Sequence, residues 1–473
     1  MTEASKIKEK LFYKRTNAWE GMTDDRIHEI SDFSEKYMSF MDSAKTEREF
    51  IRTTISLLED NGFISLKNAY DTGQKLYAGD KVYMSRNEKT VLMAVIGKNS
   101  LKNGINMVGA HVDCPRLDLK PLPLYEDSEL AYLKTHYYGG IRKYQWVSIP
   151  LSLHGIVIKK NGEKININIG EDDGDPVFVI TDLLPHLASE QSNKKLGEAF
   201  PGESLNVLIG SMPFSEEDIS QKVKLSILNH LYTKYGMLEE DFMTAELEVV
   251  PAFKARNVGM DMSMIGAYGQ DDRVCSYAGL QAFLNAGICS NTTLCYLADK
   301  EEIGSFGNTG AQSDILEYFV ALLIELIETK PKNIKVRDVL NQSTMLSGDV
   351  NAAYDPNYKS VFEKNNSVYL GNGVAIEKYT GARGKSGASD ASCELMHKII
   401  RILNDNGIIW QVGELGKVDA GGGGTISKFA AALGIDVLDI GIPLMSMHAP
   451  FEVASKVDVF MCYLAFKAFY ENS

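Results

Sequence analysis

The sequence predicts an α/β fold that is interrupted by a β-rich insertion. Strand-like and helical runs alternate after Pro251, which is the pattern of an α/β sheet covered by helices. Between about residues 115 and 251 helical periodicity gives way to short β-rich runs. The chain has 473 residues, whereas a single hydrophobic core stops growing at about 250–300 residues. We therefore expect two domains, one inserted into the other.

The first 114 residues carry an amphipathic helical region and three strands. Apolar side chains recur at helical spacing over Phe33–Leu58, and Asn61-Gly62 follows as a stop signal. Two apolar runs around Arg86-Asn87 predict a strand pair, and a third run leads to His111. These strands are expected at Lys81–Met84, Thr90–Ile96 and Ile105–Ala110. The third strand would place His111 at an edge of the sheet.

Residues 115–251 have a different texture. Strands are expected at Val147–Leu153, Gly155–Lys159 and Ile165–Ile169, and Asn161-Gly162 is a hairpin signal. A helical pattern covers Asp182–Gln191, and a loop is expected over Ser192–Gly202. We expect residues 1–114 and 252–473 to form one discontinuous α/β domain around this insertion.

Helices and strands alternate again in the last part of the chain, as in α/β sheets. Helices are expected at Val274–Asn285, Asp314–Glu328, Ser389–Asn404 and Ala454–Tyr470. Strands are expected at Thr293–Ala298, Ile408–Leu415 and Asp436–Ile442.

The composition argues against several classes of function. The formal net charge is -14 and the pI is near 5.2, so nucleic acid and anionic membranes are not expected as partners. The most apolar stretch, Tyr318–Ile327, is too short to cross a bilayer. Met1–Arg15 lacks the apolar core of a secretory signal, and the six cysteines form no Cys-x-x-Cys pair. We expect a cytoplasmic protein with reduced thiols.

The most informative motif is the pair Glu301-Glu302, which follows an apolar strand-like run and precedes Gly304. Adjacent carboxylates repel each other unless each has its own task. In two-metal hydrolases one carboxylate can hold a metal ion while the other takes a proton from the attacking water. The pair therefore indicates a hydrolytic metal site.

Four further segments place histidine or aspartate at the ends of apolar runs and supply hard ligands for two divalent ions. They are His111-Val112-Asp113, Asp271-Asp272-Arg273, Gly348-Asp349 and Met447-His448. Residues i and i+2 face the same side of an extended chain, so Asp113 is placed to orient the His111 imidazole.

Taken singly, each segment also has a plain structural interpretation. A lone His-x-Asp is compatible with an ordinary surface pair, and the aspartates before Arg273 are compatible with a helix N-cap. Asp349 fits a turn, and His448 fits a buried histidine with satisfied hydrogen bonds.

The ordered set His-x-Asp, Asp-Asp, Glu-Glu-x-Gly, Gly-Asp and Met-His resembles the co-catalytic metallo-aminopeptidases, specifically the aspartyl aminopeptidase family (metallopeptidase family eighteen). Further segments resemble that family in the same order over nearly the whole chain. They are Ala110–Pro121, Pro185–Ala188, Asp271–Ala282, Asp355–Tyr358 and Lys467–Phe469. The resemblance implies a zinc-aminopeptidase-like three-layer sandwich, split by a β-rich dimerisation domain at residues 115–251.

The resemblance also implies a ligand set for two divalent metal ions. Asp271 would bridge the ions, His111 and Asp349 would complete the shell of one, and Glu302 and His448 would complete that of the other. Zinc is the expected metal, with cobalt and manganese as alternatives.

Two catalytic roles follow from the same resemblance. Glu301 would be the general base, and Asp113, which orients His111, is also counted among the catalytic residues. His186 would reach into a neighbouring subunit's active site and stabilise the oxyanion, a contribution of about a few kcal/mol. A histidine packed within the insertion is the alternative. Members of the family form tetrahedral dodecamers, so we expect a homo-oligomer here, with dimers that assemble to a tetrahedral dodecamer.

The specificity segment departs from the family pattern. Relatives that prefer acidic N-terminal residues place a lysine after a Val-Ile-like pair, whereas the segment Gly373–Lys378 puts Glu377 at that position. A shift of one residue in the alignment would return the role to Lys378. A carboxylate repels an acidic side chain, so we expect a preference for neutral or basic N-terminal residues. The run Gly421–Thr425 fits either a backbone close to the substrate or a plain turn.

These observations predict a metallo-aminopeptidase that acts on peptides with a free N-terminus. A metal-dependent deacylase or carboxypeptidase on the same scaffold is the alternative among enzymes. A catalytically silent shell or cargo protein is the alternative outside them. The intact pair Glu301-Glu302 argues against a silent protein, because a scaffold does not need adjacent carboxylates beside a metal.

Overall fold

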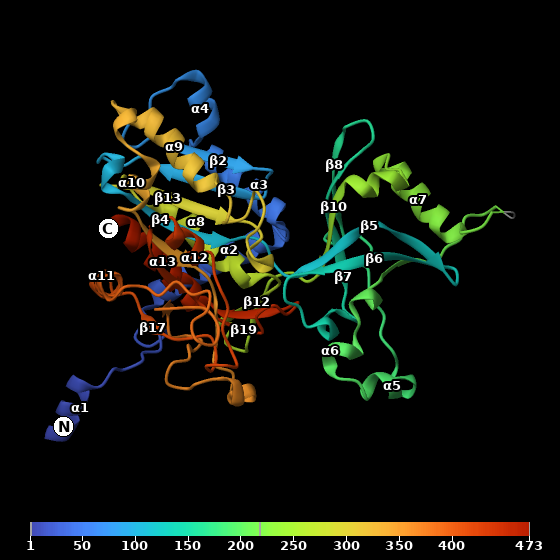
Figure 1. Ribbon diagram of the computed structural model, residues 1–473. Helices are drawn as coiled ribbons and strands as arrows, with labels where there is room; N and C mark the ends of the chain where they lie inside the picture. The colour runs from blue at the N-terminus through green and yellow to red at the C-terminus, as the bar shows by residue number, and fades with distance from the viewer. Residues whose placement is uncertain (1, 217–218, 473) are drawn as a thin grey trace.

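The computed structural model describes residues 2–216 and 219–472, which form two lobes (Figure 1). A larger α/β lobe carries both described ends of the chain, and a β-rich lobe projects from one side of it. Residues 1 and 473, the outer limits of the expected α/β domain, and residues 217–218 of the insertion lie outside the described part. Helix α1 (Glu3–Leu11) extends away from the α/β lobe. No helix of the described residues could span a membrane.

A nine-stranded mixed sheet forms the centre of the α/β lobe. Its strand order is β1-β2-β3-β13-β4-β14-β18-β16-β17, and the four strands from β13 to β18 in that order run parallel. The strands are β1 (Ile64–Ser65), β2 (Lys81–Arg86), β3 (Thr90–Val95), β4 (Ile105–His111), β13 (Thr292–Ala298), β14 (Thr344–Gly348), β16 (Val374–Glu377), β17 (Trp410–Val412) and β18 (Asp436–Gly441).

Helices cover both faces of this sheet and make the lobe a three-layer sandwich (Figure 1). Alternate residues of β3 point into different cores: Val91 and Met93 into one, Leu92 and Ala94 into the other. The first core is closed by α2 (Asp24–Ser43), α3 (Glu47–Asp60), α8 (Gln270–Asn285), α11 (Cys393–Asp405) and α13 (Lys456–Asn472). The second is closed by α4 (Leu66–Thr72), α9 (Ile315–Ile327), α10 (Val336–Leu340) and α12 (Ser427–Ala432). The predicted three-layer α/β fold is confirmed.

The β-rich lobe is built from residues between β4 and β11. Its six-stranded antiparallel sheet has the order β8-β7-β10-β5-β6-β9 and its own apolar core. The elements are β5 (Arg116–Asp127), β6 (Leu130–Tyr138), β7 (Leu151–Ile158), β8 (Lys164–Ile169), β9 (Val207–Gly210), β10 (Ala245–Pro251), α5 (Ser189–Ser192), α6 (Leu196–Ala199) and α7 (Lys222–Tyr235).

A third, small sheet lies below the central one, next to the β-rich lobe (Figure 1). Its five strands are in the order β11-β12-β20-β19-β15. They are β11 (Arg256–Val258), β12 (Met264–Ala267), β15 (Asn351–Ala352), β19 (Pro443–Met445) and β20 (Glu452–Ser455).

Several elements differ from the sequence prediction. The expected single helical region Phe33–Leu58 is two helices, because α2 ends at Ser43 and a capping box at Thr46 starts α3. The two strands expected on either side of His154 are one strand, β7. The helix expected over Asp182–Gln191 is reduced to the 3-10 turn Pro185–Leu187 and the start of α5, and the expected loop contains α6.

A buried polar cluster joins the two lobes. His154 of β7 contacts Glu49 of α3 through Nδ1 at 2.8 Å and Glu171 through Nε2 at 3.0 Å. Lys45 Nζ donates to Glu171 at 2.7 Å and to the Pro251 carbonyl at 2.9 Å. Burial by itself lowers the pKa of His154, but the two carboxylates outweigh burial and raise this pKa above its usual value. The lobes are therefore connected by paired, buried charges.

Candidate active site

The candidate site lies at the carboxyl ends of the central parallel strands. β4, β13 and β14 run side by side in the same direction, so residues that follow them meet at one edge of the sheet. β4 ends at His111, β13 leads to the 3-10 turn Glu301–Ile303, and Asp349 follows β14. Strand direction explains how residues far apart in the sequence come together.

Two further residues reach this edge from other elements. Asp271 lies at the start of α8, where Gly269 is the N-cap and no side chain caps the helix. The alternative of an ordinary capping aspartate is therefore wrong for the described geometry. His448 follows β19 and has a left-handed backbone, with φ at 65°.

The Asp271 carboxylate lies between two imidazoles. His111 Nε2 is 3.3 Å from Asp271 Oδ1, and His448 Nε2 is 3.1 Å from Asp271 Oδ2. His448 Nε2 is also 3.4 Å from Glu302 Oε1. The two oxygens of one carboxylate thus face two different nitrogen donors, as a bridging ligand requires.

Both imidazoles are oriented by backbone carbonyls. His111 Nδ1 is 2.9 Å from the carbonyl oxygen of Asp113, and His448 Nδ1 is 2.8 Å from that of Gly140. A carbonyl only accepts hydrogen bonds, so in each ring Nδ1 carries the proton and donates it. The Nε2 lone pairs are left to bind a cation.

Two overlapping groups of side chains have the spacing of metal ligands. The first consists of His111, Asp272 and Asp349, and the second of His111, Asp271 and Glu302, with the ligand atoms of each within 4.8 Å of one another. Asp272 is fully buried and neither of its carboxylate oxygens has a hydrogen-bond partner. Burying an ionised carboxylate without a partner lowers the stability of the fold by about several kcal/mol. A cation bound beside it would remove that cost.

The electrostatics of the cluster point to the same requirement. Burial raises the pKa values of Glu302, Asp272 and Asp349 well above their usual range, and neighbouring aspartates or thiols add to the shift. Burial by itself lowers the pKa of His448, but the carboxylates Asp271 and Glu302 outweigh burial and raise this pKa to about 10. The acidic groups crowd one another and are short of positive charge. Divalent cations supply that charge, so the residues fit a metal centre.

Glu301 lies beside this cluster but is held differently. Asp113 Oδ1 accepts the backbone N–H of Glu301 at 3.0 Å, and Asp113 Oδ2 accepts that of Glu302 at 3.2 Å. Burial raises the pKa of Glu301, against the opposing effect of His111. Its side chain lines a cavity of about 410 Å³ together with Asp271 and Asp349. A carboxylate in this place can accept a proton from a molecule in the cavity.

Comparisons with known proteins agree with this geometry. The family model of the aminopeptidase I zinc metalloproteases (M18) matches residues 40–470. A protein of Clostridium acetobutylicum named as a probable M18 family aminopeptidase 1 is 47% identical over 462 residues, which are 98% of this chain and 99% of the relative. The chain belongs to the M18 aminopeptidase family. It is therefore a metal-dependent aminopeptidase of a zinc metalloprotease family, as the sequence predicted.

Solved structures of M18 enzymes share the fold. The crystal structure of an M18 aminopeptidase from Thermotoga maritima matches with a TM-score of 0.91 at 44% identity, covering 98% of this chain and 100% of that one. Aminopeptidase I from Clostridium acetobutylicum matches with a TM-score of 0.89 at 44% identity and the same coverage. The mApe1 dodecamer of S. cerevisiae, at 22% identity and a TM-score of 0.76, shares the fold.

The two residues considered for specificity lie in different places. Glu377 ends β16, is buried, and lines the cavity near Asp349. Burial, and then Asp439, raises the pKa of Glu377 well above its usual value. Lys378 Nζ is 2.6 Å from Asp390 Oδ1 and its side chain is 46% exposed. Residues Gly421–Gly424 also line the cavity, so this glycine run is close to the space where substrate would bind.

His186 is not part of this group within one chain. It lies in the exposed 3-10 turn Pro185–Leu187 of the β-rich lobe and does not line the cavity. Figure 1 shows the neighbouring α5 and α6 at the end of that lobe, away from the central sheet.

The structure adds supporting residues that the sequence analysis did not identify. Asp272 belongs to a segment that the sequence offers for metal ligands, but the sequence analysis gives this residue no role of its own. Glu452 of β20 is buried and its carboxylate accepts the backbone N–H groups of Asp271 and His448 at 3.1 and 2.6 Å. An isolated glutamate in a short strand gives no signal of this role. The adjacent pair Asp271-Asp272 does carry a signal, because either aspartate of such a pair could be a metal ligand.

Proposed function

We propose that this M18 aminopeptidase holds two divalent ions per subunit, with Asp271 between them. His111 and Asp349 are assigned to one ion, and Glu302 and His448 to the other. The observation that carries the proposal is the position of Asp271, whose two oxygens face His111 and His448 at 3.3 and 3.1 Å. Asp272 is an additional candidate ligand beside Asp349, because its buried oxygens have no other partner.

Divalent ions in such a site supply Lewis-acid polarisation of the substrate carbonyl and lower the pKa of water. Glu301 then takes a proton from the attacking water and returns it to the nitrogen of the leaving peptide. The Asp113 carboxylate accepts the backbone N–H of Glu301 at 3.0 Å. The same carboxylate lies beside His111, with Asp113 Oδ1 3.4 Å from His111 Nδ1. The base and the ligands therefore share one rigid support.

We infer that the substrate is a peptide with a free N-terminus whose first side chain is neutral or basic. The support is Glu377, a buried carboxylate on the wall of the cavity, while Lys378 is paired with Asp390 outside it. A carboxylate in the cavity wall disfavours an acidic side chain.

We further propose that residues 115–251 form a dimerisation domain in a homo-oligomeric, cytoplasmic enzyme. The support is the separate β-rich lobe and the dodecamer of the fold relative mApe1. His186, exposed on that lobe, is then available to a second subunit's active site as an oxyanion donor.

Metal analysis with a substrate comparison tests the proposed function. Purified enzyme is expected to bind two metal ions per subunit, and chelation is expected to abolish hydrolysis until zinc, cobalt or manganese is restored. Asp271→Asn should lose both ions, because it removes the shared ligand. An N-acetylated peptide should not be cleaved. Cleavage of the acetylated peptide would favour the carboxypeptidase or deacylase alternative, and one ion per subunit would overturn the two-ion assignment.

A further inference from the structure

The segment Tyr138–Gly140 brings the β-rich lobe into contact with the candidate metal ligands. β6 ends at Tyr138, and the two glycines after it pass directly beside the cluster. A Cβ atom at Gly139 would lie 3.3 Å from the Glu302 Oε2 atom, and one at Gly140 would lie 3.3 Å from His448 Nδ1. Gly139 also has φ at 71°, which suits glycine. The backbone of the lobe thus approaches the ligands as closely as glycine allows.

This segment makes two hydrogen bonds in the site, one with His448 and one with Asp113. The Gly140 carbonyl accepts the proton of His448 Nδ1 at 2.8 Å. The Tyr138 hydroxyl donates to Asp113 Oδ2 at 2.8 Å. Asp113 is completely buried, and it otherwise holds the N–H groups of Glu301 and Glu302 and contacts the His111 imidazole. Tyr138 therefore acts on the carboxylate that holds the backbone of the proposed base and lies beside one imidazole.

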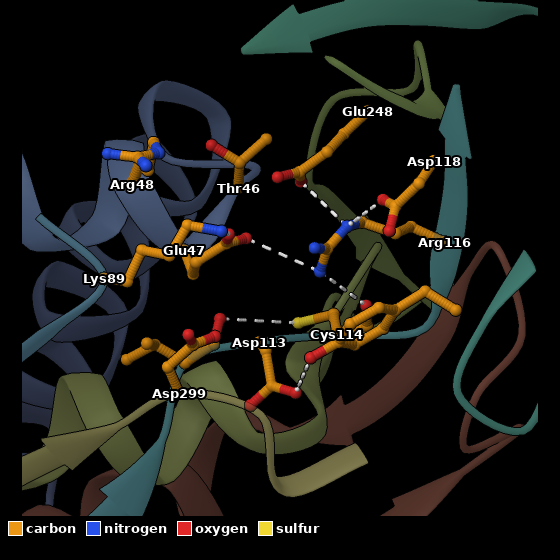
Figure 2. Close-up of polar contacts among 12 residues, drawn as sticks. Thr46, Glu47, Arg48, Lys89, Asp113, Cys114, Arg116, Asp118, Glu248 and Asp299 are labelled. Atoms are coloured by element: carbon orange, nitrogen blue, oxygen red, sulfur yellow. Dashed lines mark hydrogen bonds and ion pairs between the residues drawn. The ribbon is translucent and has the colours of Figure 1, made fainter. Parts of the chain in front are cut away.

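The Tyr138 ring is itself held in place by a buried ion cluster. Arg116 is its direct cross-strand neighbour in β5, and the guanidinium lies 3.9 Å from the ring centroid. Figure 2 shows Arg116 between Glu47 and the pair Glu248 and Asp118, with Arg116 Nε 3.0 Å from Glu248 and 2.8 Å from Asp118. Glu47 in turn starts α3 of the α/β lobe and is paired with Lys89 at 3.0 Å.

This cluster holds Arg116 over the Tyr138 ring, whose hydroxyl bonds to Asp113. Arg116 belongs to β5 of the β-rich lobe, and Glu47 belongs to α3 of the α/β lobe. Their ion pair therefore links the two lobes. Burial, and then Asp113, raises the pKa of Tyr138 above its usual value, so its hydroxyl stays a donor in alkaline buffers. A phenol with a clamped ring loses little further freedom when it donates.

We propose that Tyr138, with the carbonyl of Gly140, is a positioning residue of the β-rich lobe that holds Asp113 and the histidine ligands in their working orientation. This inference rests on the proposed ligand roles of His111 and His448. Outer hydrogen-bond partners of metal-bound histidines change metal affinity or activity by about 10–100-fold when they are removed. The lobe would then support catalysis within its own subunit, independently of any role in assembly.

The experiment compares Tyr138→Phe with Tyr137→Phe. The first removes only the hydroxyl that donates to Asp113 and leaves the ring over Arg116. The control removes the hydroxyl of a 44% exposed neighbour, which has no hydrogen bond in the described part of the chain. For each zinc-loaded enzyme kcat and KM are measured with a leucine chromogenic substrate. Zinc affinity is measured separately by competition with a chromogenic chelator, and melting temperature by calorimetry.

Tyr138→Phe is expected to lower kcat by about 10–100-fold with KM within about twofold, and to weaken zinc binding by a similar factor. Tyr137→Phe should match the wild type. Gly140→Ala, which places a methyl group against His448, should weaken zinc binding as well. The inference is overturned if Tyr138→Phe keeps the kcat and zinc affinity of Tyr137→Phe, or if its activity falls only in proportion to the folded fraction. If the double variant His111→Ala/His448→Ala retains zinc, the ligand assignment fails instead.

Discussion

At the residue scale, the adjacent carboxylates Glu301 and Glu302 have separate surroundings. Glu302 Oε1 lies 3.4 Å from His448, whereas Glu301 faces the cavity without an imidazole partner among the described contacts. Asp113 holds the backbone of both. These different surroundings support the proposal that Glu302 is a ligand and Glu301 is the base.

Replacing Glu301 by glutamine tests this division. Because the amide keeps the shape but cannot accept the proton of water, Glu301→Gln should lower kcat by about 10²–10⁴-fold while zinc content stays at the wild-type value. Glu325→Gln, at an exposed position of α9, is the matched control and should change neither quantity. Loss of zinc in Glu301→Gln would instead make Glu301 a ligand.

The Glu377 carboxylate gives a prediction about specificity. Like charges brought together cost several kcal/mol, and about 1.4 kcal/mol is a factor of ten. At a pH where Glu377 has lost its proton, Glu377→Gln should therefore raise kcat/KM for an Asp-terminated substrate relative to a Lys-terminated one by about tenfold or more. Because the pKa of Glu377 is raised, the wild-type discrimination against Asp should grow as pH rises and the carboxyl loses its proton. Lys378→Met is the control and should leave the ratio unchanged. A wild-type enzyme that prefers Asp would contradict the hypothesis.

The sequence identified the candidate ligands because residue type and strand-end position agree. His111 and Asp349 follow runs of apolar residues that are recognisable as strands, and parallel strands place their ends together. The sequence analysis gives Asp272 no role of its own, because a helix cap and a metal ligand look alike in sequence. The support from Tyr138 was not identifiable either, since it depends on a contact between lobes that no local pattern encodes.

At the element scale, the His154 cluster predicts how the junction of β7 and α3 responds to pH. The pKa of His154 is raised in the folded protein, so its contribution is complete below its unfolded pKa, about 6.5, and is lost as pH rises through the folded value. The pKa values of Glu49 and Glu171 are lowered by His154, against burial, so their contribution is complete above about 4.3 and is lost at lower pH. The junction should be strongest between about pH 4.3 and 6.5.

His154→Gln should therefore lower the melting temperature most in that window. A buried hydrogen bond to a charged group contributes about 1.5–3 kcal/mol, so a loss of that order is expected near pH 6 and a smaller one near pH 9. Calorimetry of both proteins across pH measures the difference. His397→Gln, at an exposed position of α11, serves as the control. A deficit that is the same at pH 6 and pH 9 would show that the charge on His154 contributes nothing.

Element boundaries show what local sequence can and cannot give. The break between α2 and α3 is written in the sequence as Thr46 and Glu49, a capping box that overall periodicity concealed. The sequence analysis predicts no strand over β5, and this segment contains Pro121 and Pro123, which are unusual inside strands. The structure places both in a register shift between Leu119 and Leu124, where the ladder needs fewer donors. The register shift that accepts the two prolines depends on pairing with β6, so the sequence of β5 alone does not predict it.

At the scale of the whole molecule, the β-rich lobe contacts the active site of its own chain and carries an exposed histidine elsewhere. Its near end, Tyr138–Gly140, lies against the ligands of its own chain, and His186 lies exposed in another part of the lobe. If His186 serves a second subunit, each active site depends on residues from two chains. The sequence indicated that the insertion was separate, but the distance of His186 from its own cavity required the folded chain.

Mixed oligomers test the dependence on two chains. Alone, His186→Ala and Glu301→Gln should each be nearly inactive, the first by about 10²–10³-fold through loss of the oxyanion donor. When the two are co-expressed, half of the two-fold symmetric dimers are mixed, and one site of each mixed dimer pairs an intact Glu301 with an intact partner histidine, so about a quarter of all sites should recover full activity. The activity of the unselected co-expressed mixture, relative to an equal amount of wild type, measures this recovery, and different tags on the two chains verify that they have mixed. If His186 acted within its own chain, the mixture would contain no intact site and activity would stay at the level of the parent variants.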